Sequence, residues 1–234
     1  MSNVTAAALR ELHRLHSQLA DLRGRLERGP KQVAAHKASV AKLEAAAAAA
    51  HQLVQDTRKA ADGKQLDVKA QEEKIATWNG QLNSASSNKE YQTLQEQIAA
   101  GEMAASVLED ETLELLGRVD DLVVAAGEAD KHVESGKAEL AKVEENVAAT
   151  SETLRSEVAR LEADLEAAEK QLPGDFKGDY QRVVRARGAE GLAPSEDGVC
   201  NGCGQSITLN MQNDLALSRP VFCKSCGCLL YLPE

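Results

Sequence analysis

Apolar residues recur every three and four positions along most of the chain. Steps of three and four residues in turn, starting at Tyr91, reach nineteen positions up to Leu154, and fifteen of them are apolar. The other four are glycine or threonine, and none is charged. A repeat kept over so many heptads is typical of supercoiled helices. Beyond Leu154 the repeat continues one residue out of phase to Leu172, which is a stutter.

The first part of the chain has the same period, less densely, between Leu12 and Leu82. The segment NSASSNKE, residues 83–90, lies between the two series and is rich in residues that favour caps and turns. If the chain folds back there, apolar positions pair when their residue numbers add to 173. The predicted layers include Leu82 with Tyr91, Ile75 with Ile98, Val40 with Val133, Leu26 with Val147 and Leu19 with Leu154, and Trp78 is expected to pack with Leu94 close to this register.

These patterns predict a mainly α protein in which residues 1–172 form one antiparallel coiled-coil hairpin with its tip at about 83–90. Gly29-Pro30 is expected to kink or briefly break the first helix, because proline lacks a backbone donor and clashes with the preceding turn. In this arrangement the rings of Trp78 and Tyr91 pack in the last core layers.

From Pro173 the pattern changes, and residues 173–234 are predicted to form a separate small lobe with short β-strands. A short helix is expected at about 176–187, followed by a connection that contains glycine and proline. The segments SITLNM (206–211), PVFC (220–223) and CLLYLP (228–233) are interpreted as strands.

The lobe contains two Cys-x-x-Cys-Gly units, CNGCG and CKSCG, with 19 residues between Cys203 and Cys223. Two residues between thiolates let both sulfurs face one ion, and the glycine relieves the tight backbone turn that follows. Cys200, Cys203, Cys223 and Cys226 are therefore predicted to bind one structural Zn²⁺. So small a lobe buries too little surface to fold without such a metal.

Cys228 is the fifth cysteine and lacks this spacing. We interpret it as a small buried side chain at the start of an apolar strand; a fifth metal ligand or a redox role is the alternative. Clustered cysteines in a chain without a secretion signal indicate metal binding in the cytoplasm more than disulfides.

Composition and charge limit the kinds of function that we expect for this protein. Aromatic residues make up only 3% of the chain, and the net charge is −10. Residues 173–234 carry six basic and seven acidic residues, so the remainder of the chain carries the excess of acid. An acidic coiled coil disfavours extensive phosphate binding. No stretch is long and apolar enough to predict a membrane span.

Two motifs carry a resemblance to a known family. NKEYQTLQEQI (88–98) resembles a KEY-containing signature, and CKSCGCLLY (223–231) resembles a C-P-x-C-G-R-I-L-Y ending, both found in bacterial C4-type zinc-ribbon proteins with a long N-terminal coiled-coil hairpin. Lys224 and Cys228 replace the usual proline and arginine. The resemblance implies an adaptor or chaperone whose protein partner is a sigma factor or a flagellar or secretion component, and in some members transcript binding.

We expect protein binding at the tip, through Lys89, Glu90 and Tyr91, because packing does not require the two charged residues there. The alternative is RNA or DNA binding by the zinc ribbon and the basic helix beside it. That alternative rests on Lys177, Arg182, Arg185 and Arg187, with Phe176, Tyr180, Phe222 and Tyr231 available to stack on bases.

An enzyme is not expected. The sequence shows no nucleophile–histidine arrangement, no phosphate-binding loop and no sign of a small-molecule substrate, and a Cys₄ site leaves no open coordination position. His13 and His16 are interpreted as exposed helix residues.

Overall fold

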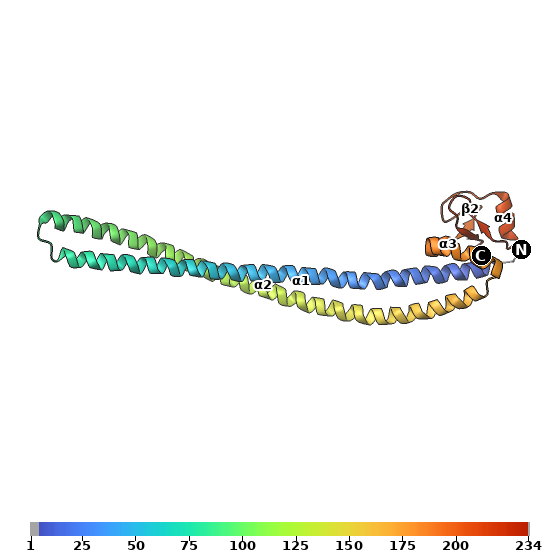
Figure 1. The fold of residues 1–234 in the computed structure, drawn as a ribbon, viewed down its shortest axis with the longest axis horizontal. Helices are drawn as coiled ribbons and strands as arrows, with labels where there is room; N and C mark the ends of the chain where they lie inside the picture. The colour runs from blue at the N-terminus through green and yellow to red at the C-terminus, as the bar shows by residue number, and fades with distance from the viewer. Residues whose placement is uncertain (1–4, 234) are drawn as a thin grey trace. The chain divides into compact units, whose positions relative to one another are not determined.

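A computed structural model describes residues 5–233, and within them the protein is mainly α-helical. Helix α1 spans Ala6–Leu82 and helix α2 spans Asn88–Lys170. The two are joined by a short loop and form the predicted helical hairpin (Figure 1). Residues 1–4 of the predicted coiled coil and residue 234 of the predicted lobe lie outside the described residues.

The chain divides into two compact units. One contains the residues up to Ala34 together with those from Val143 onward, and the other spans Ala35–Lys142. The first unit holds the start of α1, the end of α2 and the C-terminal lobe, whereas the second is built from the two long helices alone. The boundary between residues 172 and 173, which the sequence suggests for separate domains, stays a prediction.

The predicted seam is the buried face of both helices. Ile98, Ala105, Val119 and Ala126 are buried on α2, and Val54 is buried on α1. The prediction is wrong for Tyr91, whose side chain is 43% exposed. The aromatic ring therefore does not complete the last core layer at the tip, although Trp78 is half-buried, as expected.

The register of the hairpin differs from the predicted one. A side chain at Gly101 would lie 3.1 Å from Ile75, and one at Gly136 would lie 3.6 Å from Val40. The residue numbers of both contacts add to 176, three more than predicted. Trp78 also lies over Gly101, 2.9 Å from the position that a Cβ would take. Large side chains thus face glycines, and this close approach sets a register that counting apolar positions does not reveal.

Helix α1 continues through Pro30 without interruption. The predicted break at this position is therefore wrong, and the helix tolerates the missing backbone donor. Gly29 has a packing role beside the proline, because a Cβ there would lie 2.9 Å from Val147 of α2. The small residue lets the two helices approach closely at this level.

The C-terminal lobe follows α2 directly. Helix α3, Gly174–Arg187, confirms the predicted short helix, and a 3₁₀ turn at Gly188–Gly191 follows it. The remaining elements are strands β1 (Leu192–Glu196), β2 (Val199–Cys200), β3 (Val221–Phe222) and β4 (Leu229–Tyr231) and helix α4 (Leu209–Ala216). The four strands form one sheet in the order β2-β1-β4-β3, in which β1 and β4 run parallel.

The structure confirms strands within PVFC and CLLYLP, but a strand over SITLNM is wrong. Thr208 caps a helix there, because its Oγ1 accepts a hydrogen bond from the backbone N–H of Met211 (3.4 Å). The cap turns the apolar residues that follow onto one face of α4, where Met211 and Leu215 are buried. Only Ser206 keeps a strand-like contact, an isolated bridge to Val199.

Two apolar clusters meet at the sheet. One packs α3 and β4 against the start of α1, with Leu12, Phe176, Tyr180 and Leu229 all buried. The other lies within the lobe and consists of Ala193, Cys200, Ile207, Met211, Leu215, Val221, Cys223, Cys228 and Leu230. Three cysteines thus form part of the lobe's own core.

Candidate metal centre

The four predicted metal ligands lie together in the lobe. The Sγ atoms of Cys200, Cys203, Cys223 and Cys226 all lie within 4.8 Å of one another. Cys200 ends strand β2 and Cys223 follows strand β3, so the sheet brings the two Cys-x-x-Cys units to the same point. Among the described residues, this is the one cluster of three or more possible ligands.

The sulfur spacing fits a tetrahedral metal ion. The Sγ atoms of Cys200 and Cys226 are 3.7 Å apart, and those of Cys203 and Cys223 are also 3.7 Å apart. A zinc ion bound at about 2.3 Å by four thiolates requires sulfur–sulfur distances of about 3.8 Å. A disulfide would place two sulfurs about 2.0 Å apart, and all five cysteines are free. The donor set therefore fits one Zn²⁺, with each Cys-x-x-Cys unit supplying two ligands.

The backbone turns in the same way around both units. The N–H of Gly204 donates to the carbonyl of Cys200, and the N–H of Gly227 donates to that of Cys223, each over 2.8 Å. Both glycines adopt positive φ, 72° and 74°, where other residues are strained. The glycine that follows each pair of cysteines is therefore required by the turn that points both sulfurs inward.

The thiols differ in how readily they lose a proton. Burial raises the pKa of Cys200 to about 12. Burial acts in the same direction on Cys226, but the backbone N–H of Cys228 and the neighbouring thiols outweigh it and lower the pKa of Cys226 to about 6. Since the thiolate is the form that binds metal, each of these thiols loses its proton when a metal binds.

Cys228 is buried beside the cluster and is part of a separate hydrogen-bond network. Its side chain is 1% exposed, and its Sγ accepts a hydrogen bond from Nη1 of Arg187 (3.0 Å) and donates one to the carbonyl of Glu190 (3.2 Å). The contact with Cys228 raises the pKa of Arg187. The predicted small buried side chain is confirmed, and the thiol also joins α3 and the turn after it to β4.

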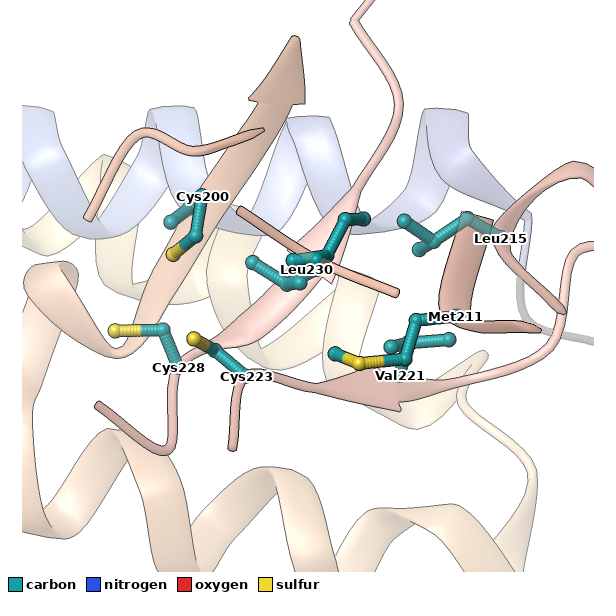
Figure 2. Packing of buried hydrophobic residues seen from close by; sticks show 9 residues of the cluster. Cys200, Met211, Leu215, Val221, Cys223, Cys228 and Leu230 are labelled. Atoms are coloured by element: carbon teal, nitrogen blue, oxygen red, sulfur yellow. The ribbon is translucent and has the colours of Figure 1, made fainter. Parts of the chain in front are cut away.

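The sheet core continues directly from the cysteines (Figure 2). The sulfur atoms of Cys200, Cys223 and Cys228 gather on one side of Leu230, and Met211, Leu215 and Val221 lie on its other side. Leu230 is fully buried between the two groups. The cysteine cluster and the apolar core of the lobe are therefore packed together as one cluster.

Two histidine–tyrosine contacts that sequence reasoning missed join the lobe and α3 to the start of α1. Nδ1 of His13 lies 2.8 Å from the hydroxyl of Tyr231, and Nε2 of His16 lies 2.7 Å from that of Tyr180. The Tyr180 hydroxyl donates to Oε1 of Glu169 (3.0 Å) on α2. The prediction that both histidines are exposed is wrong: both are half-buried, and burial lowers the pKa of each.

The four basic residues of α3 have different contacts and different exposure. Arg182 pairs with Asp179 (3.0 Å), Arg187 donates to Cys228, Lys177 is half-buried and Arg185 is exposed. The predicted stacking platform is wrong, because Phe176, Tyr180 and Tyr231 are at most 9% exposed and pack in the core. Phe222 is half-buried.

At the tip, Lys89, Glu90 and Tyr91 form the first turn of α2, so the loop itself covers only residues 83–87. Glu90 has a structural role that the sequence analysis did not assign: its Oε2 accepts from the N–H of Ser86 (3.1 Å), and its own N–H donates to Oγ of Ser87 (3.3 Å). This reciprocal arrangement resembles a capping box. An open depression of about 660 Å³ beside it is lined in part by Lys89, Glu90 and Leu94.

The sequence profile of the CT398-like coiled-coil hairpin domain matches residues 9–188, well over half of the chain. This chain belongs to that family. The match covers α1, α2 and α3 and ends before the first cysteine. Curated protein sequences give no match.

Three solved structures share the fold of this family member. CT398 from Chlamydia trachomatis has 16% identity and a TM-score of 0.80 over 97% of this chain and 98% of its own. HP0958 from Helicobacter pylori has 13% identity and a TM-score of 0.67 over the whole of both chains. A Mycobacterium smegmatis protein has 16% identity and a TM-score of 0.69 over 99% and 100% of the two chains. No helix in the described part of the chain is apolar enough over a sufficient length to cross a membrane.

Proposed function

We propose that this hairpin-family member is a non-enzymatic adaptor or chaperone whose C-terminal lobe binds one structural Zn²⁺. The observation that carries the proposal is the set of four sulfurs, whose 3.7 Å spacings fit a closed tetrahedral site. Four protein ligands leave no position for a substrate or an activated water. The metal therefore stabilises the lobe and supplies no chemistry.

A protein partner accounts best for the rest of the molecule. A helical hairpin of 77 and 83 residues presents long exposed surfaces, and the depressions at its tip and beside Gly29 are open. The resemblance at residues 88–98 and 223–231 supports a partner from the transcription machinery, such as a sigma factor, or from flagellar or secretion assembly. We place this protein in the cytoplasm, where clustered thiols remain reduced.

The tip is the first surface that we assign to the partner. Lys89 has no hydrogen bond from its side chain to another described residue, and the ring of Tyr91 is 43% exposed with only a 3.5 Å contact to Gln95. Both side chains are therefore available for contacts with another protein. Glu90 is different, because its carboxylate shapes the start of α2.

The test is a pull-down from a native lysate with zinc-loaded, full-length protein. We expect a component of the transcription or flagellar and secretion machinery to be captured, and replacement of Lys89 and Tyr91 by alanine to reduce its recovery by about tenfold, as for central contacts of an interface. Lys59→Ala is the matched control, since its side chain is 74% exposed on α1 away from the tip.

Equal recovery by the tip variant would remove the tip from the proposal. Capture of nucleic acid alone, with no protein that survives a nuclease treatment, would overturn the adaptor function. Turnover of a small molecule by the zinc-loaded protein would overturn its non-enzymatic character.

A further inference from the structure

One face of α2 carries large apolar side chains that the hairpin leaves exposed. Met103, Val107, Leu113 and Val124 are 68%, 57%, 66% and 67% exposed. Met103 and Val124 lie three heptads apart, so in a coiled coil they occupy the same position on the helix. This set, which we call the α2 outer face, lies opposite the seam residues Ala105, Thr112, Val119 and Ala126, which are all buried.

The α2 outer face is also acidic. Between residues 102 and 121 the helix carries seven acidic residues, Glu102, Glu109, Asp110, Glu111, Glu114, Asp120 and Asp121, and one basic residue, Arg118. Glu111 pairs with Lys64 of α1. The other six have no ion pair with any residue in the described range 5–233. Their charge is therefore not neutralised within the protein.

The facing helix lacks this combination. Residues 53–74 of α1 lie level with this part of α2 in the observed register, and they carry five basic and five acidic residues. Their exposed large apolar side chains are Leu53 and Leu66, 44% and 67% exposed. An apolar row with an unbalanced negative charge is thus a property of one helix, and it is not a general feature of the hairpin surface.

We propose that the α2 outer face binds a basic amphipathic helix of a partner protein, with Met103, Val107, Leu113 and Val124 as its apolar contacts and the six unpaired carboxylates around its lysines and arginines. Met103 and Val107 are four residues apart, the spacing at which an amphipathic helix makes its contacts, and Leu113 and Val124 extend the same outer side of α2. Opposite charges across an interface favour association and select against wrong partners.

The negative charge of this face disfavours other occupants. A second copy of the chain would bring carboxylates against carboxylates, and nucleic acid and anionic lipid surfaces would be repelled in the same way. The inference rests on the proposed protein-binding function and gives the chemistry of the partner and a second surface, away from the tip.

The experiment measures binding of a fluorescently labelled 18-residue amphipathic helix of leucine and lysine to the full-length, zinc-loaded protein by anisotropy. The comparison probe has the same leucine positions with glutamate in place of lysine. We expect the lysine peptide to bind and the glutamate peptide not to bind. The variant Met103→Ser, Leu113→Ser, Val124→Ser should weaken binding by about tenfold or more, the effect expected for removing central apolar contacts.

Two further variants separate the contributions. Leu53→Ser with Leu66→Ser on α1 is the control for lost exposed apolar surface and should leave binding within about twofold of the wild type, as expected for residues outside an interface. Asp110→Asn, Glu114→Gln, Asp121→Asn keeps the apolar row and should also weaken binding. All these positions are exposed, so each variant should stay helical, which circular dichroism would check.

The inference is overturned if the α1 control weakens binding as much as the α2 variant, since attraction would then be unspecific. It is also overturned if the glutamate peptide binds equally, or if the α2 variant changes the oligomeric state in sedimentation, which would make this face a contact between copies. If the wild-type protein does not bind the lysine peptide but still captures a partner from the lysate, this inference fails and the proposed adaptor function stands.

Discussion

In the segment Ala35–Lys142 most buried residues recur every seven positions and many of them are alanine or valine, whereas the C-terminal lobe buries side chains of several sizes around four cysteines. On α1 the series is Val40, Ala47, Val54 and Ala61, and on α2 it is Ile98, Ala105, Thr112, Val119 and Ala126. Each layer buries little surface, so the stability of this segment is the sum of many similar layers.

The lobe has no such repetition. Its strands contain two to five residues each, and its core holds Leu230, Ile207, Met211, Leu215 and Val221 beside the sulfurs. A core of this size rarely exceeds the cost of ordering the chain unless a metal or a disulfide adds to it. In the proposed arrangement, the stability of the hairpin is distributed over many layers, whereas that of the lobe depends mainly on one metal site.

Loss of a metal ligand should have the largest effect, because it should unfold the lobe and leave the long helices folded. Cys223→Ala leaves three thiolates, and because structural zinc contributes of the order of 10 kcal/mol to folding of small zinc domains, we expect the lobe to unfold while the long helices remain. Metal analysis should give about one Zn²⁺ per wild-type chain and almost none for the variant.

Cys228→Ala is the matched control, since Cys228 is a buried cysteine of the same sheet that lies outside the four-sulfur set. It should keep its zinc. Equal zinc loss in both variants would show that the assignment of the four ligands is incorrect.

The contact between α3 and α1 should have the next largest effect. Tyr180→Phe removes a hydroxyl that contacts His16 and Glu169, and because the Tyr180 side chain is buried, we expect a loss of about 1–3 kcal/mol in the free energy of unfolding measured in urea. Tyr91→Phe, at an exposed position, should change it by less than about 0.5 kcal/mol. Similar values for the two variants would contradict the role given to Tyr180.

Glycine substitutions should test how closely the two helices approach each other in the hairpin. Gly117→Ala meets no atom within 4 Å and should stabilise α2 by up to about 1 kcal/mol, because alanine is the better helix former. Gly101→Ala gains the same propensity but places Cβ 2.9 Å from Trp78. We expect it to be less stable than Gly117→Ala by about 1–3 kcal/mol in thermal unfolding, the usual cost of overpacking. If both substitutions stabilise the protein alike, close approach at Gly101 does not set the register.

Acid should weaken the contact at His16, and we expect this effect on stability to be smaller than those of the substitutions above. Burial lowers the pKa of His16 in the folded protein, an effect that Arg23 and His13 reinforce and Glu169 opposes. The folded state therefore binds a proton less readily than the unfolded state, so this contribution to stability is present above the ordinary pKa of 6.5 and falls as the pH drops below it.

Stability measured in urea between pH 5 and pH 8 should show this decline in the wild type and less of it in His16→Gln, which keeps a hydrogen-bonding side chain without the titrating group. Zinc release at low pH affects both proteins alike, so the difference between them is the informative quantity. A variant that declines as steeply as the wild type would argue against a buried neutral His16.

The hairpin and the clustering of the four cysteines could be predicted from the sequence because both depend on short-range spacing. The heptad period requires only positions three and four apart, and the Cys-x-x-Cys-Gly units fix the geometry of each ligand pair locally. The register could not be predicted, since it depends on Trp78 and Ile75 facing Gly101 across the hairpin.

The features that were missed depend on single local contacts or on distant partners. Thr208 converts a predicted strand into α4 through one capping bond. Glu90 looked like a free surface residue because its partners are backbone and hydroxyl groups of the loop. His13 and His16 looked exposed because Tyr231 and Tyr180, which cover them, are more than 160 residues away in the chain.

Hydrogen–deuterium exchange of the zinc-loaded, full-length protein, with and without a chelator, tests most directly whether a metal holds the lobe and helix packing holds the hairpin. We predict that metal removal abolishes the protection of amides in residues 192–231 and leaves residues 40–126 as protected as before. Protection that persists in the lobe without metal, or that disappears from both regions together, would contradict this account.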